Sequence, residues 1–127
     1  MRLVLVRHAE AAPGTPDELR TLTAEGHDQA RQLGHRLRAQ GIEPDAVLTS
    51  PFLRARETAV DLGFGQPEDD DALAPGANEE DVRTVVADRG ETVVVVGHQP
   101  DCGQIAAALS GGAEPAFPPA GAQIIEL

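Results

Sequence analysis

The segment Thr92–Val96, with the sequence Thr-Val-Val-Val-Val, constrains the fold more than any other part of the chain. A run of β-branched residues favours an extended strand, and a strand that is apolar on both faces has to be covered on both sides. Leu3–Val6 is a second short apolar run of this kind. Both runs therefore predict buried strands in the interior of a sheet.

Helical patterns alternate with these strands. Thr23 is a suitable N-cap for the first helix, in which Ala30, Leu33 and Leu37 form the apolar stripe. The alternation predicts an α/β fold, a three-layer α/β/α sandwich with a mostly parallel central sheet. The expected helices run from Thr23 to Gly41, from Ser50 as N-cap and Pro51 to about Leu62, from Asn78 to Gly90 and over about Asp101–Leu109; further strands are expected at Ala46–Thr49 and, as a closing edge strand, at Gln123–Leu127, with a loop over Gly63–Gly76 that holds the acidic run Glu68–Asp71.

The chain of 127 residues is expected to form one domain, residues 1–127. Hydrophobic residues make up 41 %, but there are three Phe and no Trp or Tyr, so the core has to be aliphatic. The one cysteine, Cys102, excludes an intrachain disulfide and is expected to be a small buried side chain. No signal peptide precedes the first strand, and we expect a cytoplasmic protein.

The chain is strongly acidic, with a formal net charge of −11, and its ten cationic side chains are all arginines. This charge argues against nucleic acid or an anionic membrane surface as the main partner. A local cluster of arginines is correspondingly informative.

Polar residues follow three of the expected strands at the point where each strand ends. These are Arg7-His8, the segment Ser50 to Arg54, and Gly97-His98. In an open parallel sheet, ligands bind beyond the carboxyl ends of the strands. We therefore expect these distant segments to meet at one edge of the sheet.

Two histidines and two arginines at one edge suit a phosphoryl group. Arg7 and Arg54 can offer forked donors to its oxygens, and Arg54 is expected about one turn into its helix, near the free amides of the helix N-terminus. A neutral imidazole can attack phosphorus, which makes His8 the expected nucleophile, and His98 is expected to bind the phosphoryl oxygens, with an imidazolium as one option. We expect the nearby positive charge to hold one imidazole neutral. Position alone leaves open that each of the four is an ordinary structural or surface residue.

Three motifs add to this argument. VLVRHAEA at residues 4–11, TSPFLRARETA at 49–59 and VVVVGHQP at 93–100 resemble, in the right order, the signatures of the histidine phosphatase superfamily, which includes the phosphoglycerate mutases. RTLTAEG at 20–26 is similar to the segment that opens the first helix in that family, and the short chain looks most like the SixA-type phosphohistidine phosphatases. The resemblance implies a phosphatase that forms phospho-His8 in a pocket of Arg7, Arg54 and His98, with no metal or other cofactor.

The chain departs from the family pattern in two places. Ala9 stands where the broad signature has glycine, a small change that is not expected to abolish activity. No clear proton donor is present: Glu10, beside the nucleophile, can equally face solvent, and Glu79 and Glu80, with Asp81, are more simply charges at the start of a helix.

The missing acid points to the substrate. An alkyl phosphate leaves as an alkoxide and needs a proton, whereas phosphohistidine leaves as a near-neutral imidazole. A phosphohistidine in a partner protein is therefore the expected substrate. A small phosphoester such as a sugar or nucleotide phosphate, and a non-catalytic module that binds a phospho-ligand, are alternatives; a mutase is disfavoured by the short chain. His27 and His35 are expected to face solvent, and no third ligand accompanies them for a metal site.

Overall fold

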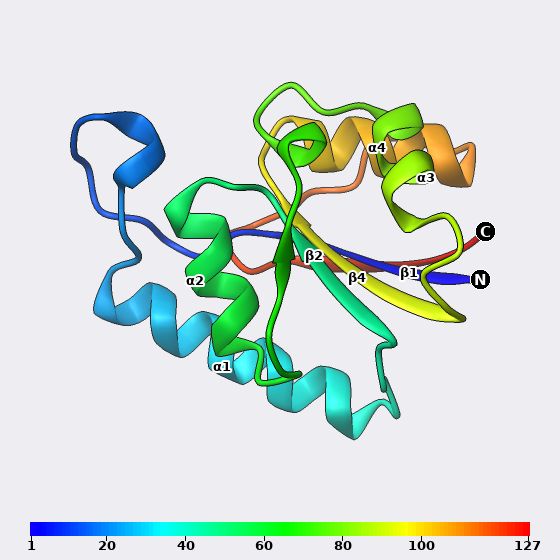
Figure 1. Cartoon of the computed structure of the whole chain (residues 1–127), viewed down its shortest axis with the longest axis horizontal. Coiled ribbons are helices and arrows are strands. Elements are labelled where there is room, and N and C mark those ends of the chain that lie inside the picture. The colour runs from blue at the N-terminus through cyan, green and yellow to red at the C-terminus, as the bar shows by residue number, and fades with distance from the viewer.

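A five-stranded sheet forms the centre of the molecule in the computed structural model, which describes all residues, 1–127. Its strand order is β3-β2-β4-β1-β5, and only the edge strand β5 is antiparallel to its neighbour (Figure 1). The mostly parallel central sheet is thus confirmed, as is the position of the closing strand at an edge. The strands are β1 (Arg2–Arg7), β2 (Ala46–Thr49), β3 (Glu68–Asp69), β4 (Thr92–Gly97) and β5 (Ala122–Glu126).

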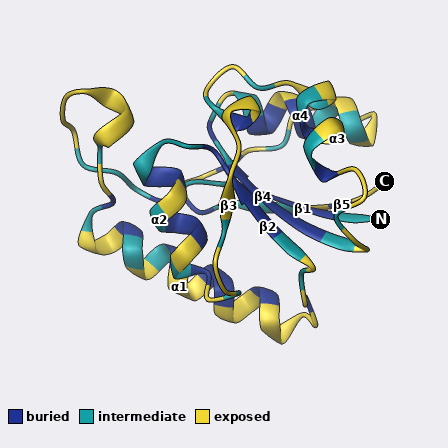
Figure 2. Cartoon of the chain, viewed as in Figure 1, coloured by how far each residue is buried: buried dark blue, intermediate teal, exposed yellow.

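Two helices cover each face of this sheet. On one face α1 and α2 pack against alternate strand residues such as Val4, Val47 and Val94. On the other face α3 and α4 pack against the strand residues that alternate with these, such as Leu5, Leu48 and Val95. Figure 2 shows the central strands β1, β2 and β4 mostly buried and each helix exposed on its outer side. These three layers are the predicted α/β/α sandwich. The helices are α1 (Ala24–Ala39), α2 (Leu53–Asp61), α3 (Glu79–Val86) and α4 (Asp101–Ser110), with short 3₁₀ helices at Asp17–Leu19 and Asp71–Leu73.

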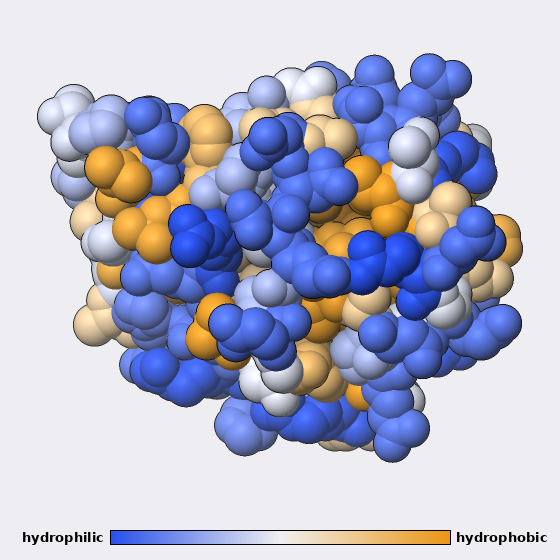
Figure 3. Space-filling model, in the orientation of Figure 1, coloured by the Kyte–Doolittle hydropathy of each residue, from blue (hydrophilic) through white to orange (hydrophobic).

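The core is aliphatic, as the composition requires. Buried Val, Leu, Ile and Ala side chains make up almost all of it, and Phe117 is its one buried aromatic residue. The face of the molecule drawn in Figure 3 is mainly hydrophilic, with hydrophobic groups visible between the polar ones. None of the helices combines the length and the apolar character that crossing a bilayer requires.

The helix α1 lies unusually close to its neighbours because two glycines face them. Thr23 caps the helix as predicted, with its hydroxyl accepting a hydrogen bond from the amide of Gly26. A Cβ at Gly26 would lie 2.1 Å from the carbonyl oxygen of Glu10, and one at Gly34 would lie 2.1 Å from that of Leu62. Only glycine therefore allows α1 to rest against both the segment after β1 and the end of α2.

Two predicted helix boundaries and one predicted loop differ from the structure. α2 begins at Leu53 rather than Pro51, because the Ser50 hydroxyl accepts from the amide of Phe52 in a turn that precedes the helix. α3 ends at Val86, well before Gly90. The expected loop over Gly63–Gly76 contains the two-residue strand β3, paired in parallel with the end of β2, and a 3₁₀ turn after it.

Candidate active site

The strand register places the three polar segments at one edge of the sheet. Arg7 pairs with Gly97 across β1 and β4, and Thr49 pairs with Val96 across β2 and β4. His8, His98 and Ser50 directly follow the last paired residues of β1, β4 and β2, so the three segments leave the sheet at the same edge. The His8 and His98 rings lie 5.3 Å apart between centroids, with planes inclined by 61°.

The hydrogen bonds of His8 define which of its nitrogens is available to react. Its Nδ1 lies 2.7 Å from the carbonyl oxygen of Ala9. A carbonyl oxygen can only accept, so Nδ1 carries the ring proton and Nε2 carries the lone pair. Arg54 donates from Nε to that Nε2 over 3.3 Å. The nitrogen that carries the lone pair therefore faces the guanidinium group of Arg54, which is able to donate to a phosphoryl oxygen.

His8 is neutral at physiological pH. Its pKa is lowered to about 4, chiefly by burial and then by the positive charges of Arg54, Arg7 and Arg20, against the opposing effect of the hydrogen bond to Ala9. The expected direction is correct, but the arginines are not the main cause, because removal of the ring from water has the larger effect.

His98 presents the opposite character. Its side chain is buried, its Nε2 lies 2.8 Å from the Ser50 hydroxyl, and its Nδ1 is buried without a partner in the protein. Because that hydroxyl accepts from the amide of Phe52 and is free to donate, we assign the ring proton of His98 to Nδ1. Burial, the like charge that His8 carries once it is protonated, and the charge of Arg54 lower the pKa of His98 to about 3. Without a bound anion His98 is thus a neutral donor rather than an imidazolium.

Arg54 is buried, with 6 % of the residue exposed, and it is held from several sides. Besides the bond to His8, it donates from Nη1 to the carbonyl oxygen of Asp17 over 2.9 Å and from Nη2 to the Asp17 carboxylate over 3.3 Å. Its guanidinium carbon also lies 5.1 Å from the centre of the Phe52 ring. Arg54 sits in the first turn of α2, so it shares this region with the N-terminal amides of the helix.

Arg7 is anchored by residues 117–121, a segment in which no sequence motif indicates a role. Its Nη1 donates to the carbonyl oxygen of Phe117 over 2.9 Å, while its Nε is buried without a partner in the protein. Two backbone hydrogen bonds also join this segment to β1 and His8. The amide of Arg7 donates to the carbonyl of Gly121, and the amide of Ala120 donates to the carbonyl of His8. Residues 117–121 therefore close the site from the side of β5.

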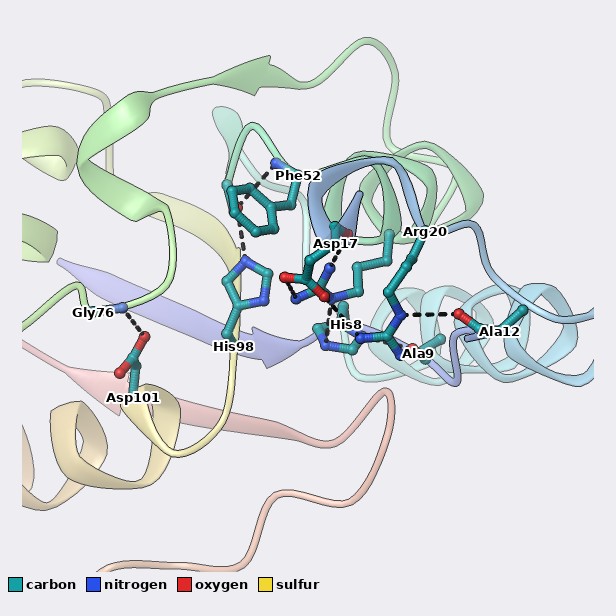
Figure 4. A network of polar contacts seen from close by, with 11 residues as sticks. His8, Ala9, Ala12, Asp17, Arg20, Phe52, Gly76, His98 and Asp101 are labelled. Atoms are coloured by element: carbon teal, nitrogen blue, oxygen red, sulfur yellow. Dashed lines mark hydrogen bonds and ion pairs between the residues drawn. The ribbon is translucent and has the colours of Figure 1, made fainter. Parts of the chain in front are cut away.

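Asp17 and Arg20 are two further members of the site that sequence reasoning missed. Asp17 lies on the 3₁₀ helix that follows β1, and its carboxylate contacts both Arg54 and Arg20. Figure 4 shows it pointing toward the rings of His8 and His98. The only sequence signal was the position of Asp17 three residues before RTLTAEG, in a polar loop without periodicity.

Ala9 is compatible with the fold of the loop. It is fully buried in the core and is not among the residues with positive φ. Its amide donates to the Thr58 hydroxyl over 3.0 Å, and that hydroxyl donates to the carbonyl of Arg54. Thr58 thus ties the His8 loop to the helix that carries Arg54, which gives the threonine of the second motif a structural role.

The three carboxylates considered as proton donors form no hydrogen bond with the four central residues. Glu10 turns toward α1, where its carboxylate accepts from the Thr23 hydroxyl over 3.0 Å. Glu79 and Glu80 occupy the first turn of α3, whose N-cap Asn78 forms a capping box with Asp81. The positions of Glu79 and Glu80 match their interpretation as charges at the start of a helix.

The remaining candidates lie apart from this site. His27 is half-buried rather than solvent-facing, because its Nδ1 pairs with Asp61 of α2 over 2.6 Å, while His35 is exposed. His27 and Asp61 line a separate groove of about 420 Å³ between α2 and β3. Cys102 is buried as expected, and burial raises the pKa of its thiol to about 12. No three His, Cys, Asp or Glu side chains gather as a metal site would require.

The arrangement is suited to transfer of a phosphoryl group. A neutral imidazole offers a lone pair, while two arginines and the Nδ1–H of His98 offer donors around the same point. Buried donors are almost always paired in native proteins, so the unpartnered Arg7 Nε and His98 Nδ1 mark a place for an external acceptor. Oxygens of a phosphoryl dianion meet that requirement.

Comparisons with known proteins agree with this geometry. Residues 3–74 match the model of the histidine phosphatase superfamily (branch 1). The chain is 32 % identical to the phosphohistidine phosphatase SixA of Escherichia coli, over 91 % of this chain and 78 % of that protein. A structure of the protein histidine phosphatase SixA complexed with tungstate superposes with a TM-score of 0.90 at 28 % identity, over 100 % of this chain and 88 % of the other. A putative SixA from Agrobacterium tumefaciens superposes with a TM-score of 0.82 at 26 % identity, over 97 % and 89 %.

Proposed function

The chain belongs to the histidine phosphatase superfamily, and from this premise we propose that it removes phosphoryl groups from phosphohistidine in a partner protein, through a phosphorylated His8. The family expected from the three motifs and its likeness to SixA are confirmed, and the protein is a phosphatase. The residue roles, the covalent intermediate, the substrate and a cytoplasmic location are our proposals.

One observation carries the proposal. The lone pair of His8 Nε2 faces Arg54, and two buried donors nearby, Arg7 Nε and His98 Nδ1, have no partner in the protein. A nucleophile beside unpaired donors is what an in-line attack on a phosphoryl group requires, since the donors can neutralise the equatorial oxygens. A purely structural histidine would not need them.

The reaction proceeds in two displacements. The His8 Nε2 lone pair forms a bond to phosphorus, and the bond from phosphorus to the leaving group breaks with its electron pair going to that group. The Ala9 carbonyl holds the Nδ1 proton and stabilises the positive charge that forms on the ring. Water then bonds to phosphorus, the P–N bond breaks, the electron pair returns to Nε2, and dihydrogen phosphate leaves.

The site favours a leaving group that needs no proton. The side chains of Glu10, Glu79 and Glu80 form no hydrogen bond with the four central residues. Phosphohistidine whose other ring nitrogen carries a proton leaves as neutral imidazole and does not require such an acid. The similarity to a protein named phosphohistidine phosphatase supports the same choice.

Trapping of the intermediate tests the nucleophile. Wild-type protein quenched during turnover of a radiolabelled phosphohistidine protein should carry acid-labile label on His8. His8→Ala should carry none and lose turnover, while His35→Ala, which changes an exposed histidine, should behave as wild type. Label on another residue, or near-normal turnover by His8→Ala, would refute the assignment.

A substrate comparison tests the choice of phosphohistidine. A phosphohistidine protein and a panel of sugar and nucleotide phosphates are assayed side by side for kcat/KM, with and without a chelator. We expect preference for the protein and no effect of the chelator. Preference for the small esters would overturn the substrate, and tight phosphate binding without any turnover would indicate a binding module.

A further inference from the structure

Asp17 stands at the solvent side of the site. Its Oδ2 lies 3.3 Å from Arg54 Nη2 and its Oδ1 lies 3.1 Å from Arg20 Nη1. The Arg54 side chain is 8 % exposed, whereas that of Asp17 is 56 % exposed. The carboxylate therefore lies between a buried phosphate-binding group and solvent, where the leaving group of a protein substrate has to pass.

The direction of the side chain supports this position. In Figure 4 the Asp17 side chain extends from its 3₁₀ helix, and its carboxylate points toward the rings of His8 and His98. Both oxygens already accept from arginines, but each carboxylate oxygen has two lone pairs, and the exposure leaves the second ones available. Asp17 can accept a further N–H without giving up its present contacts.

Asp17 is unsuited to act as an acid. The bond to Arg20 and the charge of Arg54 hold the pKa of this carboxyl below its usual range, so it is ionised at neutral pH. It has no proton to donate to an alkoxide. A cationic N–H at the same place would instead be stabilised by its negative charge.

The leaving group of phosphohistidine can supply such an N–H. The ring nitrogen that is not bonded to phosphorus is basic. When it is protonated, the phosphorylated ring is a cation and departs as neutral imidazole, a better leaving group than the imidazolate that an unprotonated ring would release. We propose that Asp17 accepts a hydrogen bond from this N–H and thereby selects phosphohistidine over phosphate esters. This inference rests on the proposed function, which it deepens by naming a residue that recognises the substrate.

The step balances without an external acid. His8 Nε2 gives its lone pair to phosphorus, and the P–N bond of the substrate breaks with its electron pair going to the substrate nitrogen. The substrate ring, a cation before the step, leaves as neutral imidazole and keeps its other proton. Phosphorus thus passes between two imidazoles that each keep a proton on the remote nitrogen. His8 donates this N–H to the Ala9 carbonyl, and the substrate donates its own to Asp17.

The same carboxylate disfavours esters. An alkyl or aryl phosphate offers only oxygen atoms at this position, and negative charge builds up on the departing oxygen in the transition state. A fixed carboxylate beside that oxygen raises its energy. The selectivity of Asp17 therefore combines attraction of one leaving group with repulsion of the other.

Asp17→Asn tests the inference, because the amide oxygen can still accept from Arg54 while the negative charge is removed. The measured quantity is kcat/KM for a phosphohistidine protein divided by kcat/KM for an aryl phosphate. We expect this ratio to fall about 10- to 100-fold, as for loss of a hydrogen bond to a charged group. Glu18→Gln makes the same charge change on the neighbouring exposed residue and should leave the ratio unchanged.

A pH profile separates recognition from a structural role. The carboxylate favours the protonated substrate ring in the enzyme–substrate complex, so Asp17→Asn should shift the alkaline limb of kcat for phosphohistidine to lower pH. Arg20, Arg54, His8 and His98 also face this carboxylate, but they remain in the variant. An unchanged limb, or equal losses on both substrates, would show that Asp17 only positions Arg54 and would overturn the inference.

Failure of the proposed function is seen in a different measurement. It appears in the wild type, as absence of phosphohistidine turnover beside retained turnover of the aryl phosphate, and the present inference then fails with it. Failure of the present inference alone appears only in the comparison of Asp17→Asn with Glu18→Gln, while the wild type still prefers phosphohistidine.

Discussion

Two residues of the same type have opposite hydrogen-bonding characters in this site because each is held by a different partner. The Ala9 carbonyl holds the proton of His8 on Nδ1 and leaves a lone pair on Nε2. The Ser50 hydroxyl contacts Nε2 of His98 and leaves the buried Nδ1 to donate. The partner atom, rather than the imidazole itself, decides which histidine can attack phosphorus and which can bind its oxygens.

Arg54 provides the sharpest test of phosphate binding at this scale. Arg54→Ala should lower kcat/KM by about 10²–10³-fold, as loss of one charge-stabilising donor typically does. Arg54→Lys keeps the charge but loses the fork that contacts His8 and Asp17 together, so it should recover only part of the loss. Arg56→Ala removes an exposed arginine of the same helix and should keep near-normal kcat/KM in steady-state assays. Equal kcat/KM for Arg54→Ala and this control would contradict a phosphate-binding role for Arg54.

The sequence could predict the residues that follow a strand but not those that reach the site from a loop. Arg7, His8 and His98 are placed by the sheet register, which the apolar runs define. Asp17 and Phe117 come from segments without periodicity, and only tertiary contacts bring them to Arg54 and Arg7. No local pattern marks such a residue.

At the scale of elements, the length and polarity of a segment decided how well it could be predicted. β4 is recognisable because every residue from Val93 to Val96 is β-branched and buried. β3 is not, because Glu68 and Asp69 are exposed and only two residues pair with β2. The start of α2 was misplaced since Ser50, a suitable N-cap by residue type, uses its hydroxyl for Phe52 and His98 instead.

The close approach of α1 to the end of α2 yields a prediction about stability. In Gly34→Ala the new Cβ would lie 2.1 Å from the carbonyl oxygen of Leu62, so the two elements have to separate. We expect a loss of about 1–3 kcal/mol in the free energy of unfolding, although alanine is the better helix former. Urea denaturation measures this change.

Gly112→Ala is the matched control for that experiment. The nearest atom to its new Cβ is the Ser110 hydroxyl at 4.0 Å, and its φ is not positive. Its effect should lie within about 1 kcal/mol of zero, on the stabilising side. If Gly34→Ala were as stable as this control, the contact between α1 and Leu62 would not be as tight as the structure indicates.

At the scale of the whole molecule, the distribution of charge matters more than its sum. The chain carries a net charge of −11, yet Arg7, Arg20 and Arg54 gather around His8 and help to keep it neutral. An acidic protein can thus hold a local positive pocket for a phosphoryl dianion. The cost is that two imidazoles are buried in their neutral form, and this cost depends on pH.

The depressed pKa values of His8 and His98 link the site to the stability of the entire fold. In the unfolded chain both should titrate near the ordinary value of 6.5, but in the folded protein their pKa values are about 4 and about 3. Between the folded and the unfolded pKa values the unfolded state binds more protons than the folded state. The free energy of unfolding therefore falls as the pH drops below 6.5 toward the folded pKa values, and this contribution to stability is fully present above 6.5. Carboxylates add their own dependence, which a comparison of variants removes.

We therefore expect the double variant His8→Asn/His98→Asn to lose less stability on acidification than the wild type. Between about pH 7.5 and pH 5.5 the difference in loss should be about 2 kcal/mol, after allowance for the partial exposure of His8. Urea denaturation at a series of pH values measures it, with His35→Asn as the control because that ring is exposed. Parallel curves for the wild type and the double variant would mean that both imidazoles keep ordinary pKa values in the folded protein. His8 would then be largely protonated at mildly acidic pH, and its lone pair would not be available for attack there.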